Sequence, residues 1–135
     1  MGRIIVEANV ENALDASHSI HFNALVDTGA AYLTLPTAWR ERLGPLTELD
    51  TVEVEIADQS IIEGIICGPV LLHLERFRQV MTEVLFIDMH PEADAYEPQI
   101  GYIPLEQAQA AVDMLGHRLV KVSRVDLKYR VFNIK

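Results

Sequence analysis

The chain has 135 residues and half of them are apolar, which is the size and composition of one folded domain rather than of a disordered segment. Its formal net charge is −9, from 20 acidic and 11 basic residues, and this balance disfavours nucleic acids and anionic membrane surfaces as partners. We therefore expect a single domain over residues 1–135, with no nucleic-acid and no membrane partner.

Cysteine usage and the N-terminus indicate a cytoplasmic protein. The only cysteine, Cys67, stands between apolar residues and glycine, so we expect an inert core thiol rather than a nucleophile. One cysteine cannot form an internal disulfide, which is typical of a reducing compartment. The sequence has no apolar run of about 18 residues, the length needed to cross a membrane. The N-terminal apolar run is interrupted at Glu7 and lacks the pattern of a signal peptide.

Most of the predicted elements are strands. Apolar Ile20, Phe22 and Ala24 alternate with polar residues, and residues 52–56 alternate valine or isoleucine with glutamate, so each of these stretches has one buried face. In chain order, the predicted strands cover residues 3–10, 18–26, 32–35, 52–56, 60–74, 77–87, 119–125 and 129–134.

Two short helices interrupt the strands. The first is expected over residues 37–43, because Gly44 and Pro45 follow it as a typical helix end. The second begins near Pro104 and ends at Gly116, with one apolar stripe at spacings of three and four residues. The members of that stripe are Leu105, Ala108, Val112 and Leu115. The sequence thus predicts a mostly β protein with a closed or folded-over sheet and one or two short helices.

One triplet of residues contains a candidate catalytic group. An apolar stretch runs into Asp27, which is followed by Thr28, Gly29 and Ala30, and Asp-Thr-Gly occurs once in the chain. Taken alone, the triplet fits an ordinary turn at the end of a strand, where Asp and Gly are common. It also fits a catalytic carboxylate held at the rim of a sheet. Its surroundings decide between the two interpretations.

With those surroundings, the chain resembles the retropepsin-like aspartic proteases, the small dimeric relatives of pepsin. The family pattern is an apolar strand, then Asp-Thr/Ser-Gly-Ala/Ser, and about 70 residues later an apolar pair and a glycine before a helix. Here Ile100 and Gly101 precede the second predicted helix, residues 54–60 are similar to the beginning of the family's flap hairpin, and residues 65–74 to its returning strand. The resemblance covers residues 20–115 and implies a retropepsin-like closed β-barrel with the acid protease fold.

The resemblance also implies a reaction. Aspartic proteases are hydrolases that activate water between two carboxylates, one ionised as general base and one protonated as general acid, which share a proton. One chain supplies one such carboxylate, Asp27, because no other aspartate is followed by Thr-Gly. The resemblance therefore implies a homodimer in which Asp27 of each chain meets across a two-fold axis.

The same resemblance implies supporting roles for other residues around Asp27. Thr28 braces the two active-site turns, Gly29 lets them approach, and Ala30 is small enough to lie beside substrate. Ile100 and Gly101 pack behind the turn. The flap that closes over an extended peptide or protein substrate is expected at Ala57, Asp58, Gln59, Ser60, Ile61 and Ile62.

The expected function is that of an aspartyl protease, an aspartic-type endopeptidase without metal or cofactor. His18 and His21 are three apart on a predicted strand, so they face opposite sides and make a poor metal pair. An alternative stays open: a catalytically weak or inactive module of the same fold that binds peptides or dimerises. Its motives are the polar Gln99 before Ile100, where the family has an apolar residue, and a flap without a glycine-rich tip.

Overall fold

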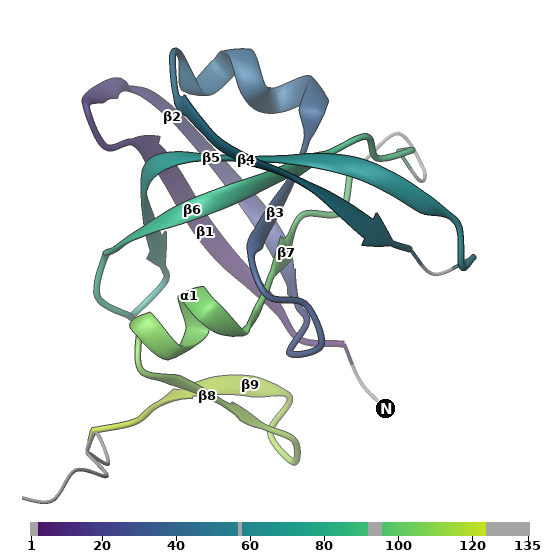
Figure 1. Cartoon of the computed structure of the whole chain (residues 1–135). Helices are drawn as coiled ribbons and strands as arrows, with labels where there is room; N and C mark the ends of the chain where they lie inside the picture. Colours follow the sequence, from purple (N-terminus) through teal and green to yellow (C-terminus); the bar gives the residue numbers. More distant parts are fainter. Residues whose placement is uncertain (1–2, 57, 92–95, 124–135) are drawn as a thin grey trace, which may run out of the picture.

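A computed structural model describes residues 3–56, 58–91 and 96–123 (Figure 1). Within these residues it has nine strands, one 3-10 helix and one α-helix. The expectation of a mostly β protein with two short helices is confirmed. In chain order the elements are β1 (Ile5–Asn12), β2 (Asp15–Val26), β3 (Leu33–Pro36), η1 (Thr37–Leu43), β4 (Thr47–Glu55), β5 (Ile61–Leu74), β6 (Val80–Ile87), β7 (Gln99–Ile100), α1 (Tyr102–Gln107), β8 (Ala110–Asp113) and β9 (Arg118–Lys121).

Seven strands form one sheet that closes on itself. Their order is β1-β2-β7-β3-β6-β5-β4, and β1 also pairs with β5, so all of them except β4 lie in a ring. Closure is possible because β5 is long and pairs in turn with β4, β6 and β1 along its length. Beyond the ring, β4 and β5 continue as a two-stranded hairpin, at the right of Figure 1.

The core fills the inside of this ring. Strand residues alternate between buried and exposed positions, as in β2, where Ile20, Phe22 and Ala24 are buried between exposed neighbours. Cys67 lies in this core with no exposed surface, as the sequence predicts, and burial raises the pKa of its thiol. The first helix, η1, covers one end of the ring, and its Trp39 lies with its ring centroid 5.8 Å from that of Phe22.

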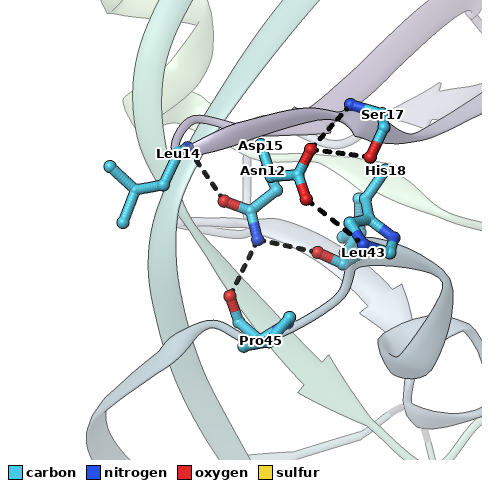
Figure 2. Close-up of polar contacts among 7 residues, drawn as sticks. All are labelled: Asn12, Leu14, Asp15, Ser17, His18, Leu43 and Pro45. Carbon is cyan, nitrogen blue, oxygen red and sulfur yellow. Dashed lines mark hydrogen bonds and ion pairs between the residues drawn. The ribbon is translucent and has the colours of Figure 1, made fainter.

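A buried asparagine fastens η1 to the turn between β1 and β2 (Figure 2). Asn12 is only 2% exposed, and its amide nitrogen donates to the carbonyl oxygens of Leu43 and Pro45, both at 2.8 Å. Its amide oxygen accepts the backbone N–H of Leu14 at 2.9 Å. The side chain thus satisfies backbone groups at the end of η1 that no helical partner could satisfy.

The second helix is shorter than predicted. It ends at Gln107, and the chain then leaves helical geometry at Gln109, whose φ is +56°. The rest of the predicted helix forms β8 and the turn to β9, a small hairpin below α1 in Figure 1. Leu105 and Ala108 are buried as expected, but the prediction for Leu115 is wrong, because this side chain is 96% exposed at the turn.

Two sequence predictions fall outside the described residues: the strand over residues 129–134 and the flap residue Ala57. Neither helix in the described part of the chain has the length and apolar character needed to span a membrane.

Candidate functional site

The turn after β2 holds Asp27 in place by hydrogen bonds of its own backbone and side chain. The Asp27 N–H donates to the carbonyl oxygen of Ile100 at 3.0 Å, which continues the parallel pairing of β2 with β7. The Asp27 carboxylate accepts the backbone N–H of Gly29 at 3.0 Å, and the Asp27 carbonyl accepts that of Ala30 at 3.1 Å. The carboxylate is therefore oriented by a tight Asp turn at the edge of the sheet. Asp27 as a whole is half-buried, whereas the hydrogen bond between its carboxylate and Gly29 lies at the exposed surface.

The strand β7 supports this turn from behind. It lies between β2 and β3, parallel to the first and antiparallel to the second, with Ile100 opposite Val26 and Leu33. Ile100 is fully buried. A two-residue strand thus joins both sides of the Asp27 turn into one unit, although it comes from a distant part of the sequence.

Gly101 packs directly against the backbone of the turn. Its N–H donates to the carbonyl of Tyr32 at 3.0 Å, and the next N–H, of Tyr102, donates to the carbonyl of Ala30 at 2.8 Å. A Cβ atom at position 101 would lie 2.5 Å from the carbonyl carbon of Ala31 and 2.6 Å from the carbonyl oxygen of Ala30. Only glycine fits here without displacing the backbone of the turn.

The hairpin between β4 and β5, here called the flap hairpin (residues 52–64), ends in a short turn. The Ile56 N–H donates to the carbonyl of Ser60 at 3.0 Å, and the Gln59 N–H donates to the carbonyl of Ile56 at 2.8 Å. Gln59 has φ +69°. Asp58 accepts both the backbone N–H and the hydroxyl of Ser60, and these hydrogen bonds hold the pKa of its carboxyl below the usual value.

The two faces of the flap hairpin differ. A Cβ at Gly64 would lie 2.7 Å from Leu85 Cδ1 and 2.9 Å from Ile87 Cγ2, so the face that carries Gly64 is turned towards β6. Val52 is opposite Gly64 in the register and lies on this inner face. The outer face carries Glu53 opposite Glu63 and Glu55 opposite Ile61.

The Asp27 turn and the flap hairpin line the same cleft, with a volume of about 850 Å³. Its walls are the turn residues Asp27, Gly29 and Ala30, residues 52–56 and Gln59 of the flap hairpin, and Leu85 and Ile87 of β6. Gln99 of β7 also lines the cleft, as do Ala31, Tyr32 and Thr34. The cleft therefore places the Asp27 carboxylate among largely apolar walls that also include two further acidic residues, Glu53 and Glu55.

The structure brings only some of the sequence-predicted residues to this cleft. Asp27, Gly29, Ala30 and Gln59 line it, whereas Ile100 and Gly101 lie buried behind the turn. Thr28, Asp58 and Ser60 are exposed outside the lining, Ile61 is 66% exposed on the outer face of the hairpin, and Ile62 is half-buried on the strand.

Sequence reasoning missed Tyr32, Thr34, Leu85 and Ile87 as lining residues of the cleft. The two β6 residues follow the ordinary pattern of a buried strand, and only the register of β6 against β3 and β5 places them beside Asp27. Tyr32 carries a weak signal, because a large amphipathic side chain directly follows the Asp-Thr-Gly-Ala-Ala run.

The candidate catalytic and metal-binding side chains have few bonded partners among the described residues. In the described part of the chain, the one hydrogen bond to the Asp27 carboxylate comes from Gly29, and no other carboxylate is bonded to it. The described residues contain no group of three or more metal-ligating side chains. His18 lies 3.5 Å from the Asp15 carboxylate (Figure 2), and His21 is exposed.

No protein-family model matches the chain, and no curated protein matches its sequence.

Proposed function

We propose that this protein is an aspartic endopeptidase of retropepsin-like fold, a homodimer in which Asp27 of two chains activates water for peptide hydrolysis. The observation that supports it best is the placement of Asp27. Its carboxylate is oriented by Gly29, braced by Ile100 and Gly101 from behind, and opens into a cleft roofed by the flap hairpin. A plain strand-end turn needs neither the buried brace nor the cleft.

The chemistry needs two carboxylates in different protonation states. The ionised carboxylate removes a proton from water, and the water oxygen attacks the peptide carbonyl carbon. The protonated carboxylate donates its proton to the carbonyl oxygen, which gives a tetrahedral gem-diol. Collapse of that intermediate, with proton transfer to the amide nitrogen, breaks the C–N bond.

A second copy of the chain supplies the second carboxylate in this proposal. The Asp27 turn lies at the rim of the sheet, and among the described residues no carboxylate is hydrogen-bonded to that of Asp27, although Glu53 and Glu55 line the same cleft. A two-fold axis beside the turn would place identical carboxylates together, because a symmetric interface brings each residue near its own copy. The shared proton then follows from the repulsion between two close negative charges.

The test is cleavage of an unfolded protein by the full chain at several values between about pH 4 and 7, because the proposed pair works only while it holds one proton and its activity should therefore depend on pH. Wild type should cut and Asp27→Asn should not. The matched control is Asp15→Asn, which changes an exposed turn aspartate bonded to Ser17, outside the cleft lining. Equal cleavage by wild type and Asp27→Asn across this range would exclude the proposed role of Asp27.

A second candidate is a peptide-binding or dimerising module with negligible turnover. Gln99 favours it, because this amide lines the cleft beside Asp27 at a position where the family carries an apolar residue. Such a module would bind extended peptides with similar affinity in wild type and Asp27→Asn and would release them intact. Mass spectrometry of the recovered peptide separates this outcome from slow cleavage.

A further inference from the structure

A second cavity shares Tyr32 with the Asp27 cleft as a lining residue. Its volume is about 460 Å³, and most of its wall is apolar. Leu49, Pro69, Met81 and Ile103 contribute that wall, and Leu49 and Met81 are 50% and 61% exposed. Large side chains left open to solvent around a concave surface are typical of a binding site. We call this cavity the accessory pocket.

One polar group in the accessory pocket needs a donor. The Gln107 side-chain nitrogen donates to the carbonyl oxygen of Met81 at 3.0 Å, which fixes the orientation of the amide. The amide oxygen of Gln107 is then buried, and no group in the described residues bonds to it. A buried acceptor without a partner is costly. Because this oxygen has almost no exposed surface, a ligand N–H group could bond to it only after the Gln107 side chain moves.

Part of one edge of β6, the strand beside the accessory pocket, is not paired with β3. β3 pairs with β6 only from Leu33 opposite Val84 onwards, so Met81, Thr82 and Glu83 of β6 are not paired with β3. These three residues line the accessory pocket. The Met81 carbonyl already accepts a hydrogen bond from Gln107, so an extended peptide could add to β6 here only through the remaining main-chain groups on this side of the strand.

The charge near the accessory pocket indicates which kind of side chain a bound ligand would carry. Among the described residues that line the accessory pocket, Glu83 is the one that is charged. It is exposed, and the chain as a whole carries −9. A basic side chain near Glu83 is favoured by both the local carboxylate and the overall field, whereas an acidic one is repelled.

Tyr32 joins the two sites, because it lines both the Asp27 cleft and the accessory pocket. We propose that the accessory pocket binds a distal stretch of the same extended peptide, one that carries a bulky apolar residue next to a lysine or arginine. Its occupant is thus a peptide long enough to pass Tyr32. This inference rests on the proposed function, since it takes the Asp27 cleft as a peptide site.

The test measures binding rather than cleavage, so that it does not depend on turnover. Fluorescence anisotropy of labelled peptides with the full-length Asp27→Asn protein compares a short apolar peptide of about six residues, roughly 20 Å when extended, with longer versions. The longer versions add a Phe-Lys or a Phe-Glu pair at either end. We expect the Phe-Lys extension at one end to tighten binding about tenfold, which corresponds to about 1.4 kcal/mol, and the Phe-Glu extension to give little gain.

Two single-residue variants test whether the gain in peptide affinity arises at the accessory pocket. Glu83→Gln should reduce the advantage of the Phe-Lys extension about threefold, and Met81→Ala should reduce that of the phenylalanine by a similar factor. Neither should change the affinity for the short peptide. Glu41→Gln is the matched control, since Glu41 is exposed on η1 and lines neither cavity.

The outcomes separate this inference from the proposed function. If extension never tightens binding, or if its gain survives in both Glu83→Gln and Met81→Ala, the accessory pocket is not a peptide site, while wild-type cleavage of the short peptide would still support the proposed function. If wild type cuts nothing but the charge-dependent gain is present, the inference stands and the protease proposal fails. If no peptide binds, both fail.

Discussion

Gly101 lies against the carbonyl carbon of Ala31 so closely that a Cβ atom at position 101 would stand 2.5 Å away from it. This contact joins the start of α1 to the loop that follows Asp27. Because the contact is with backbone, no side-chain rotation can relieve it.

Gly101→Ala should therefore destabilise the protein by about 1–3 kcal/mol and displace the Asp27 turn, with loss of peptide binding or cleavage. The matched control is Gly68→Ala, where the added Cβ meets nothing closer than 3.6 Å. Chemical denaturation followed by fluorescence of the single Trp39 gives both stabilities. If both variants lose stability equally, the close approach at Gly101 does not support the turn.

Asn12→Ala should lower the free energy of unfolding by about 2–3 kcal/mol, because it removes three hydrogen bonds and leaves the carbonyls of Leu43 and Pro45 unsatisfied in a buried place. Asn23→Ala, at an exposed position of β2, should change it by no more than about 0.5 kcal/mol. Thermal or chemical unfolding measures both. A small loss for Asn12→Ala would mean that water replaces the side chain at little cost.

The strands were predictable from the sequence because their signal is local. Alternation and apolar runs indicate residues 60–74 as a strand, and β5 covers Ile61–Leu74. The second helix was mispredicted because the residues from Leu105 to Leu115 also satisfy a helical spacing. The change of direction at Gln109, in left-handed geometry, is a backbone event that apolar spacing does not record.

The site was predictable only in part, for a related reason. Asp27 and its turn could be predicted because the residue types that indicate them are adjacent in the sequence. Tyr32, Leu85 and Ile87 line the cleft because of the way β6 pairs with β3 and β5. The register between strands that are distant in the sequence cannot be predicted from the residues of one strand alone. The same holds for the faces of the flap hairpin, where Gly64 and its contacts with β6 place Ile61 outside.

Leu115→Ser tests the shortened helix. It should change stability by no more than about 0.5 kcal/mol, because Leu115 is 96% exposed. Leu105→Ala, at a position 3% exposed in α1, should cost about 2–5 kcal/mol. Similar large losses in the two variants would instead indicate one continuous buried helix over residues 104–116.

The flap turn should keep its hydrogen bonds at acidic pH. Because the Ser60 hydroxyl and N–H bond to the ionised Asp58, the folded pKa of Asp58 lies below the ordinary value of 3.8. The stabilisation is thus fully present above that ordinary value and is lost as pH falls through the lowered folded pKa. Carboxyl carbon NMR titration should show Ser60→Ala raising the pKa of Asp58.

Ser17→Ala is the control for that titration. It removes the equivalent hydroxyl beside Asp15, whose pKa is lowered in the same way, and it should raise the pKa of Asp15 without moving that of Asp58. An unchanged Asp58 titration in Ser60→Ala would show that the hydroxyl does not hold the flap turn.

The most direct test of a shared Asp27 pair is the activity of mixed dimers. Wild-type and Asp27→Asn chains with different affinity tags are co-expressed, and the heterodimer is isolated by two successive tag purifications. Its cleavage of an unfolded protein is then compared with that of the wild-type homodimer. If the two chains form one site, the heterodimer is inactive, because one carboxylate cannot serve as both general acid and general base. A heterodimer with half the wild-type activity would show that each chain holds a complete site, and would contradict the account.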